Sequence, residues 1–355
     1  MKRFIFFALV LMGSIGTTTV SAQSTVIATL SHEGSITTFY GTPALKQALK
    51  AAEDGDIITL SPGTFQAANI DKSITLRGAG YVLDTETHTE PTIIIGDFHI
   101  SGTNGLTIEG IYHDAEMSYD CYRNEYINTN AKFIKCKFTS IDSYNNYYNL
   151  AGLVDAQFIN CIFTNEIYLS YNTNASLINC IVNNPWSNGS DGNSYFNFQN
   201  CVILGLYDTW ESWRIFRSSF YNCIINVNNQ KERSLDSTNS GYNNLCINTE
   251  GYENFFSEIL TNTKNSYETD FTNVFKDFTG DYSDDSTFSD DFTFELTDEA
   301  KQKYKGTDGT EIGIYGGTMP FDPTPSNPQI TKLNVASKST ANGKLSVDIT
   351  VKGLE

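Results

Sequence analysis

Aromatic side chains that carry a polar group are the most suggestive candidates for chemistry in this chain. Of its 355 residues, 20 are tyrosines, and many stand in stretches that separate apolar segments. Such rings stack on sugar rings, while the phenol forms hydrogen bonds. We predict that they form a ligand-binding surface; the alternative is that they cover loop backbone. The candidates are Tyr144, Tyr147, Tyr148, Tyr168 and Tyr171, together with Trp210, Trp213 and Arg214 from the one stretch that concentrates tryptophan and charge.

Acidic side chains are the second group of candidates, since 41 Asp and Glu residues against 23 Lys and Arg residues give a formal net charge of −18. The runs at residues 280–285 and 290–291 could offer oxygen ligands to calcium, but their spacing is not that of an EF-hand. A solvated acidic loop over residues 281–299 is the interpretation that we favour. We therefore predict neither a metal site nor catalytic residues in these runs.

Cysteines recur at a nearly fixed spacing. Five of the seven stand in similar hexapeptides, and a sixth, Cys246, belongs to a more divergent copy. A period of about 22 residues predicts a solenoid, in which each unit buries its apolar face only against its neighbours. Side chains at one inward position of successive coils run parallel, so we predict packed free thiols, with disulfides as the alternative and zinc disfavoured by the four histidines. The five are Cys136, Cys161, Cys180, Cys201 and Cys223.

The residue before each repeated cysteine predicts how the chain turns. It is asparagine in four of the five copies, and asparagine is the non-glycine residue that best tolerates the left-handed conformation. Gly78 and Gly110 occupy the corresponding place in earlier coils. We therefore predict a left-handed bend between two strands of every coil.

The N-terminal residues predict an export signal followed by a cap. Two basic residues, an apolar run and small residues up to Ala22 indicate a signal peptide over residues 1–22. Its removal would leave a secreted, periplasmic or cell-surface protein with a net charge of −20 and no further run long enough to span a membrane. Thr42 and Pro43 predict the N-cap and the first residue of a helix over residues 44–52, which Gly55 ends. One short helix before a series of strands predicts a cap on the open end of the solenoid.

The C-terminal residues differ in composition from the repeats. The stretch Glu311–Gly317 predicts a last strand and turn, so we expect the capped solenoid to cover residues 23–318. Four prolines predict a stiff spacer over residues 319–329. Alternating apolar residues around Asn342–Gly343 predict a β-hairpin, or an appendage, over residues 330–355.

Two of these segments resemble a known family. The stretch from Thr42 to Phe65 closely resembles the start of the pectin-lyase-like superfamily, and the Asn-Cys coils resemble its repeats. The C-terminal part is similar to uncharacterised exported β-helix proteins of Bacteroidetes. The resemblance implies an all-β fold, a right-handed three-sheet parallel β-helix with an N-terminal capping helix and a C-terminal β-hairpin tail. Lyases of this family use an arginine or lysine base with calcium, and its hydrolases use clustered aspartates, but neither motif is found in this sequence.

Three classes of function stay open. Because no catalytic constellation stands out, we predict an exported, non-catalytic protein without a cofactor that binds a polysaccharide or a cell-surface glycan. The alternative is a calcium-dependent polysaccharide lyase or another carbohydrate-active enzyme, with Arg214 as the candidate base of a lyase. The third class is an adhesive stalk. The negative charge argues against nucleic acid and anionic membranes as partners, and the sequence does not predict an oligomeric state.

Overall fold

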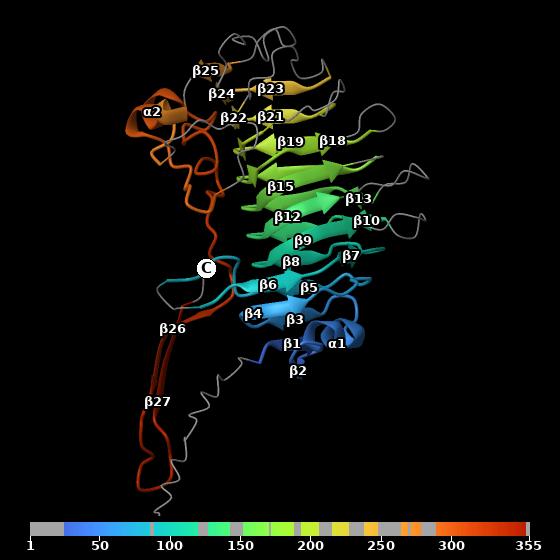
Figure 1. Ribbon diagram of the computed structural model, residues 1–355, viewed down its shortest axis with the longest axis vertical. Coiled ribbons are helices and arrows are strands. Elements are labelled where there is room, and N and C mark those ends of the chain that lie inside the picture. The colour runs from blue at the N-terminus through green and yellow to red at the C-terminus, as the bar shows by residue number, and fades with distance from the viewer. Residues whose placement is uncertain are drawn as a thin grey trace, which may run out of the picture.

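The protein is a parallel β-solenoid whose rungs stack along the long axis of the molecule (Figure 1). The computed structural model describes residues 25–85, 89–119, 127–142, 152–169, 172–187, 193–205, 215–226, 238–247, 264–268, 271–277 and 289–352. Within them the strands outnumber the helices and pair mainly in parallel. The solenoid predicted from the cysteine period, and the all-β fold that the resemblance implies, are therefore confirmed.

The first sheet runs the length of the solenoid. It begins with two antiparallel strands, and its other strands are parallel and in register. In order of pairing it contains β2 (Ser35–Tyr40), β1 (Ile27–His32), β3 (Ile57–Leu60), β5 (Thr75–Arg77), β8 (Thr107–Glu109), β11 (Lys132–Ile134), β14 (Ala156–Ile159), β16 (Asn174–Ile178), β19 (Tyr195–Gln199), β21 (Ser219–Tyr221) and β23 (Ser240–Tyr242).

The second sheet starts after each bend. Its strands are β4 (Gly63–Gln66), β6 (Thr92–Ile95), β9 (Tyr112–Tyr119), β12 (Lys137–Asp142), β15 (Ile162–Leu169), β17 (Ile181–Val182), β20 (Val202–Ile203), β22 (Ile224–Asn226), β24 (Leu245–Ile247) and β25 (Ser266–Glu268). The longest strands contain a register shift, after which β7 (Phe98–Ile100) pairs with β9 and β18 (Pro185–Ser187) pairs with β15. A further short sheet pairs β10 (Asn128–Thr129) with β13 (Leu153–Val154).

The core is built from columns of like side chains. Phe133 stacks on Phe158 with ring centroids 4.6 Å apart, and Phe198 stacks on Phe220 at 4.9 Å. The repeated cysteines are fully buried, and the six cysteines in the described part of the chain are free. Each thiol of the column hydrogen-bonds to main-chain carbonyls; Cys180 Sγ donates to the oxygens of Phe158 and Ile178, both at 3.3 Å. The prediction of packed free thiols is confirmed.

The sixth copy of the repeat lies two residues from its predicted place. Cys246 is in register with Ile225, so Asn244 occupies the position that Cys223 has in the previous rung. The Asn244 amide satisfies this buried position, because its Oδ1 accepts from the Cys223 backbone N at 2.9 Å and its Nδ2 donates to the Phe220 carbonyl at 2.9 Å. The cysteine column therefore ends at Cys223, and the divergent sixth copy places asparagine at that position.

The predicted left-handed bends are confirmed for the cysteine repeats. The residues before the five cysteines have φ values between 50° and 55°, and Gly110 has φ 64°. Gly78 is an exception, because its φ lies outside the left-handed region; a Cβ there would instead lie 2.4 Å from the Gly110 carbonyl oxygen. Close approach of two rungs, not backbone handedness, therefore requires glycine at position 78.

The N-terminal helix α1 (Ala44–Ala51) covers the first rungs (Figure 1). Its buried side is the predicted one, with Leu45, Ala48 and Leu49 inside the core. Two details differ from prediction. The N-cap residue is Pro43, and no side chain caps the helix; the helix ends at Ala51, whereas Gly55 turns the chain into β3 with φ 89°.

The C-terminal residues form a layer on the outer face of the second sheet. An outward column of aliphatic side chains, from Ile162 to Leu245, packs against Phe275, Phe294 and Ile314. This layer contains the helix α2 (Asp298–Lys303), which Thr297 caps by accepting the Ala300 backbone N–H at 3.1 Å. A helix therefore stands at the end of the predicted acidic loop. The predicted strand at Glu311–Gly317 is not formed; one bridge between Lys305 and Glu311 replaces it.

The predicted C-terminal hairpin is confirmed. Strand β26 (Gln329–Val335) pairs antiparallel with β27 (Val347–Lys352), and the hairpin projects away from the solenoid (Figure 1). Its aliphatic residues Val335, Val347, Ile349 and Val351 are each about half exposed. No helix in the described part of the chain is long and apolar enough to cross a membrane.

Candidate functional site

Most of the predicted ligand-binding residues lie outside the described residues. These are Tyr144, Tyr147, Tyr148, Tyr171, Trp210, Trp213 and Arg214. Tyr168 is described, and it is 5% exposed on β15, where its ring packs on Trp186 of β18 with centroids 4.4 Å apart. Tyr168 therefore serves as packing in this structure.

The two long faces of the solenoid differ in what covers them. The C-terminal layer buries the outward side chains of the second sheet. On the first sheet the outward residues include exposed Gln157, Asn197, Gln199 and Tyr221. The outer face of the first sheet is therefore the broad surface on which a ligand can contact several rungs at once.

A pair of tyrosines stands on this open face near its C-terminal end. Tyr221 and Tyr242 occupy the same register position on the neighbouring strands β21 and β23. Tyr221 is 47% exposed, and the two ring centroids are 6.5 Å apart at an interplanar angle of 45°. Side chains alternate between the two faces along a strand. Because Phe220 is buried in the core, the adjacent Tyr221 points outward, and so does Tyr242 at the same register position. Two rings on adjacent rungs offer a stepped aromatic platform.

Polar side chains surround the tyrosine pair. Gln199 precedes Tyr221 in the same column, and the next column contains Asn197, Ser219 and Ser240. Ser219 Oγ donates to Asn197 Oδ1 at 2.8 Å, which orients the amide so that its Nδ2 stays available as a donor. Because like residues repeat once per rung, hydroxyl and amide groups recur along the solenoid axis at about 4.8 Å.

This surface presents aromatic rings and neutral polar groups. Its three strands β19, β21 and β23 contain no charged residue, although the whole chain is strongly acidic. It therefore offers aromatic rings for stacking and neutral donors and acceptors for hydrogen bonds. We call the set Gln199, Tyr221, Tyr242, Asn197, Ser219 and Ser240 the tyrosine face.

The tyrosine face was missed at the sequence level for a definable reason. Tyr221 stands two residues before Cys223, a position filled by isoleucine in three copies and by Gln199 in the fourth. The alternation of the strand identifies this position as outward. Comparing the outward positions of successive coils, instead of counting tyrosines between them, would have found the pair.

Of the two acidic runs considered as a source of calcium ligands, residues 280–285 lie outside the described residues, and Asp290 of the second run has another partner. Both Asp290 carboxylate oxygens accept from Lys137 Nζ, at 2.7 and 2.8 Å. Lys137 also lies over the ring of Tyr112, whose hydroxyl donates to Asp114 at 2.7 Å. Burial, with the Asp114 hydrogen bond, raises the pKa of Tyr112 to about 12. This cluster joins the C-terminal layer to the second sheet, and the described residues hold no group of three or more side chains placed to bind a metal.

Comparison of the chain with protein-family models, with curated proteins and with solved structures finds no match. The functional argument therefore starts from the tyrosine face.

Proposed function

We propose that the protein is an exported, non-catalytic β-helix that binds a neutral polysaccharide on the tyrosine face. The observation that carries the proposal is the pair Tyr221 and Tyr242, which lie one rung apart with tilted rings on the outer face of the first sheet, where Tyr221 is exposed. The proposal includes export through the N-terminal signal and membership of the pectin-lyase-like superfamily, which the segment from Thr42 to Phe65 supports.

The composition of the face selects the class of glycan. Tyrosine rings pack against the apolar faces of sugar rings, and the amide and hydroxyl column can pair with sugar hydroxyls. A uronate polymer would instead approach an exported protein whose net charge is −20 once the signal is removed, and it would find no basic patch on these strands. Neutral chains of several sugar units therefore fit the surface best.

Affinity electrophoresis tests the proposal. The full-length protein is run in gels that contain neutral polysaccharides, such as xyloglucan, mixed-linkage β-glucan or mannan, beside gels with pectate or alginate. We expect retardation in at least one neutral gel. Tyr221→Ala and Tyr242→Ala should each weaken binding roughly fivefold, because an aromatic stacking contact contributes about 1 kcal/mol.

A matched control is available on the same sheet. Tyr40 on the edge strand β2 is 61% exposed and lies at the opposite end of the solenoid. Tyr40→Ala removes an exposed ring of the same kind and should leave retardation unchanged. Equal loss in all three variants, or no retardation in any neutral gel, would contradict the proposal. Formation of an unsaturated, ultraviolet-absorbing product from pectate or alginate with calcium would establish the lyase alternative instead.

A further inference from the structure

Residues 305–327, here called the strap, follow the line of bends from the last rungs of the solenoid back to the first (Figure 1). The strap contacts bend residues that are distant in sequence, from Asn243 beside Lys305 to Gly78 beside Asn327. It forms no strand with either sheet, and its one bridge, between Lys305 and Glu311, lies within the strap itself. Its path is therefore determined by the bends themselves.

Side chains at the bends form hydrogen bonds with the main chain of the strap. Asn179 Nδ2 donates to the carbonyl oxygens of Ile314 and Gly316, both at 2.7 Å. Asn160 Nδ2 donates to the Met319 carbonyl at 3.2 Å, and its Oδ1 accepts from the Asp322 backbone N at 2.6 Å. The asparagines that permit the left-handed bends thus also supply donors for an extended peptide.

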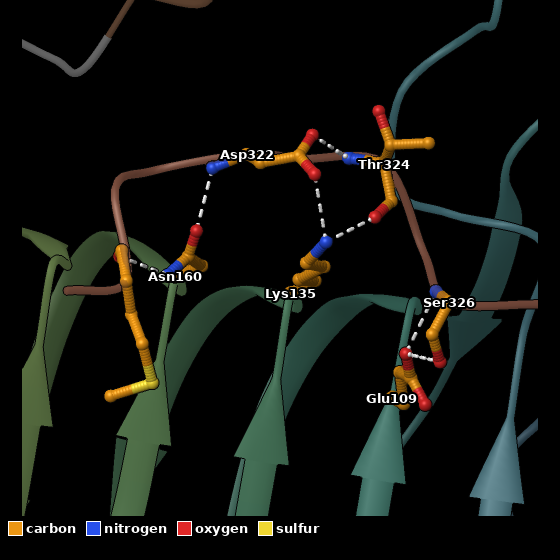
Figure 2. A network of polar contacts seen from close by, with 7 residues as sticks. Glu109, Lys135, Asn160, Asp322, Thr324 and Ser326 are labelled. Carbon is orange, nitrogen blue, oxygen red and sulfur yellow. Dashed lines mark hydrogen bonds and ion pairs between the residues drawn. The ribbon is translucent and has the colours of Figure 1, made fainter. Parts of the chain in front are cut away.

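Charged bend residues recognise strap side chains (Figure 2). Lys135 Nζ forms an ion pair with Asp322 at 2.9 Å and donates to the Thr324 carbonyl at 2.6 Å. Glu109 accepts from the backbone N of Ser326 at 2.9 Å and also from the Ser326 hydroxyl. Polar contacts therefore continue over three successive rungs.

Shape complementarity accompanies these contacts. Pro325 lies over Gly110, where an added Cβ would come within 2.9 Å of the proline, and near Gly80. At the other end Ile312 and Ile314 are buried on the second sheet, and an added Cβ at Gly313 would come within 2.7 Å of Ile224. The strap is therefore bound by apolar anchors at one end and by hydrogen bonds along its length.

We propose that the line of bends is a binding site for an extended polypeptide, and that the strap occupies it as a separable peptide ligand. Three features carry this inference. Side chains at the bends donate to main-chain carbonyls of the strap, and Lys135 and Glu109 bind Asp322 and Ser326. The strap itself contains no strand that pairs with a sheet. The same sequence supplied on another molecule then competes for the site. Attachment of the strap to the solenoid gives it a high effective concentration, which keeps the site filled in the intact chain.

The test uses the full chain with a protease recognition sequence inserted between Asp308 and Gly309, in an exposed turn. After cleavage, the fragment that starts at Gly309 should co-elute with the solenoid at micromolar concentration. A fluorescent peptide of residues 309–328 should then replace it, as measured by anisotropy. The same peptide should bind the uncut protein at least tenfold more weakly, because the attached strap competes.

Asparagine-to-glycine variants distinguish the role of asparagine in the bend from its hydrogen bonds to the strap. Glycine tolerates the left-handed φ of 50° at position 179 but removes both amide donors. Asn179→Gly should weaken peptide binding about tenfold or more, since two buried carbonyls lose their partners. Asn200→Gly is the control: Asn200 also has a left-handed φ, of 53°, but its Nδ2 has no hydrogen-bond partner among the described residues.

Each other outcome overturns the proposal. Immediate loss of the cleaved fragment would show that the bends have no affinity of their own for it. Unfolding of the solenoid on cleavage, followed by circular dichroism, would make the strap an integral part of the domain and not a ligand. Retention with equal effects of Asn179→Gly and Asn200→Gly would place the affinity in the apolar anchors alone.

Discussion

His113 should make the stability of the solenoid depend on pH. It lies on β9 with its side chain fully buried, in register with Phe138, and its ring is 5.5 Å from that of Phe98. Its Nε2 lies 3.0 Å from the Gly96 carbonyl oxygen, so Nε2 carries the proton and donates it. Nδ1 is buried and has no hydrogen-bond partner among the described residues. Burial lowers the pKa of His113 in the folded protein.

The sign and the size of the effect follow from linkage. Because the folded pKa is lower than the unfolded one, the unfolded chain binds more protons below about pH 6.5, and stability is lost as the pH falls. Each pH unit below that value costs about 1.4 kcal/mol while His113 stays neutral in the folded state. The free energy of unfolding should therefore fall as the pH drops below 6.5, with a slope of at most about 1.4 kcal/mol per pH unit through this residue.

The variant His113→Leu removes the titrating group and keeps an apolar side chain in the core. Urea unfolding of variant and parent, measured from pH 8 to pH 4.5, gives the difference in free energy at each pH. We expect the variant to be within about 1 kcal/mol of the parent at pH 8, since only the hydrogen bond to Gly96 is lost. It should gain steadily on the parent below pH 6.5. A difference that does not change with pH would refute the reasoning.

Three further predictions concern other residues. Asp56 raises the pKa of His32 through a 2.8 Å hydrogen bond, so His32→Gln should destabilise the protein below about pH 6.5 and cost progressively less as the pH rises above it, which is the opposite trend in the same urea assay. The buried cysteines should be inert to a thiol reagent in the folded protein, and most of the seven should react after denaturation without reductant; recovery of one or none would indicate disulfides. Gly313→Ala should lower the free energy of unfolding by more than the ~1 kcal/mol of left-handed strain, because its Cβ would also meet Ile224. Gly105→Ala, with φ 84° and open space around it, should show the strain alone, and equal losses would refute the clash.

The periodic part of the fold could be predicted because each rung repeats the same local requirement. A buried cysteine, an apolar residue three positions before it and a left-handed residue between them recur with little change from residue 133 to residue 225. Stacking then brings equivalent positions into register, as Phe158 beside Leu177 and Phe198 beside Phe220 show. A local pattern suffices when every neighbour is a copy of the same unit.

The sequence pattern was insufficient where contacts with other rungs or segments determine a residue. Asn244 replaces cysteine in the column because its amide can pair with backbone groups of two rungs, which a search for cysteine cannot detect. Tyr168 was counted among the binding residues because it stands in the stretch between two cysteine coils. Its partner in space, Trp186, stands 18 positions later and buries it.

The bends show how much such outside partners determine. Glycine and asparagine both tolerate a left-handed φ, so the backbone alone would treat them as equivalent. In the structure the two residues are not interchangeable. Gly110 lies beneath Pro325, where a side chain would collide with the proline. Asn160 and Asn179 donate hydrogen bonds to carbonyl oxygens of the strap, which glycine could not do. Lys135 has a φ of 51°, a conformation that lysine does not favour. Its Nζ forms the ion pair with Asp322 of the strap. At these four bends the residue therefore matches the part of the strap that passes over it, and the backbone strain at Lys135 is accepted for that contact.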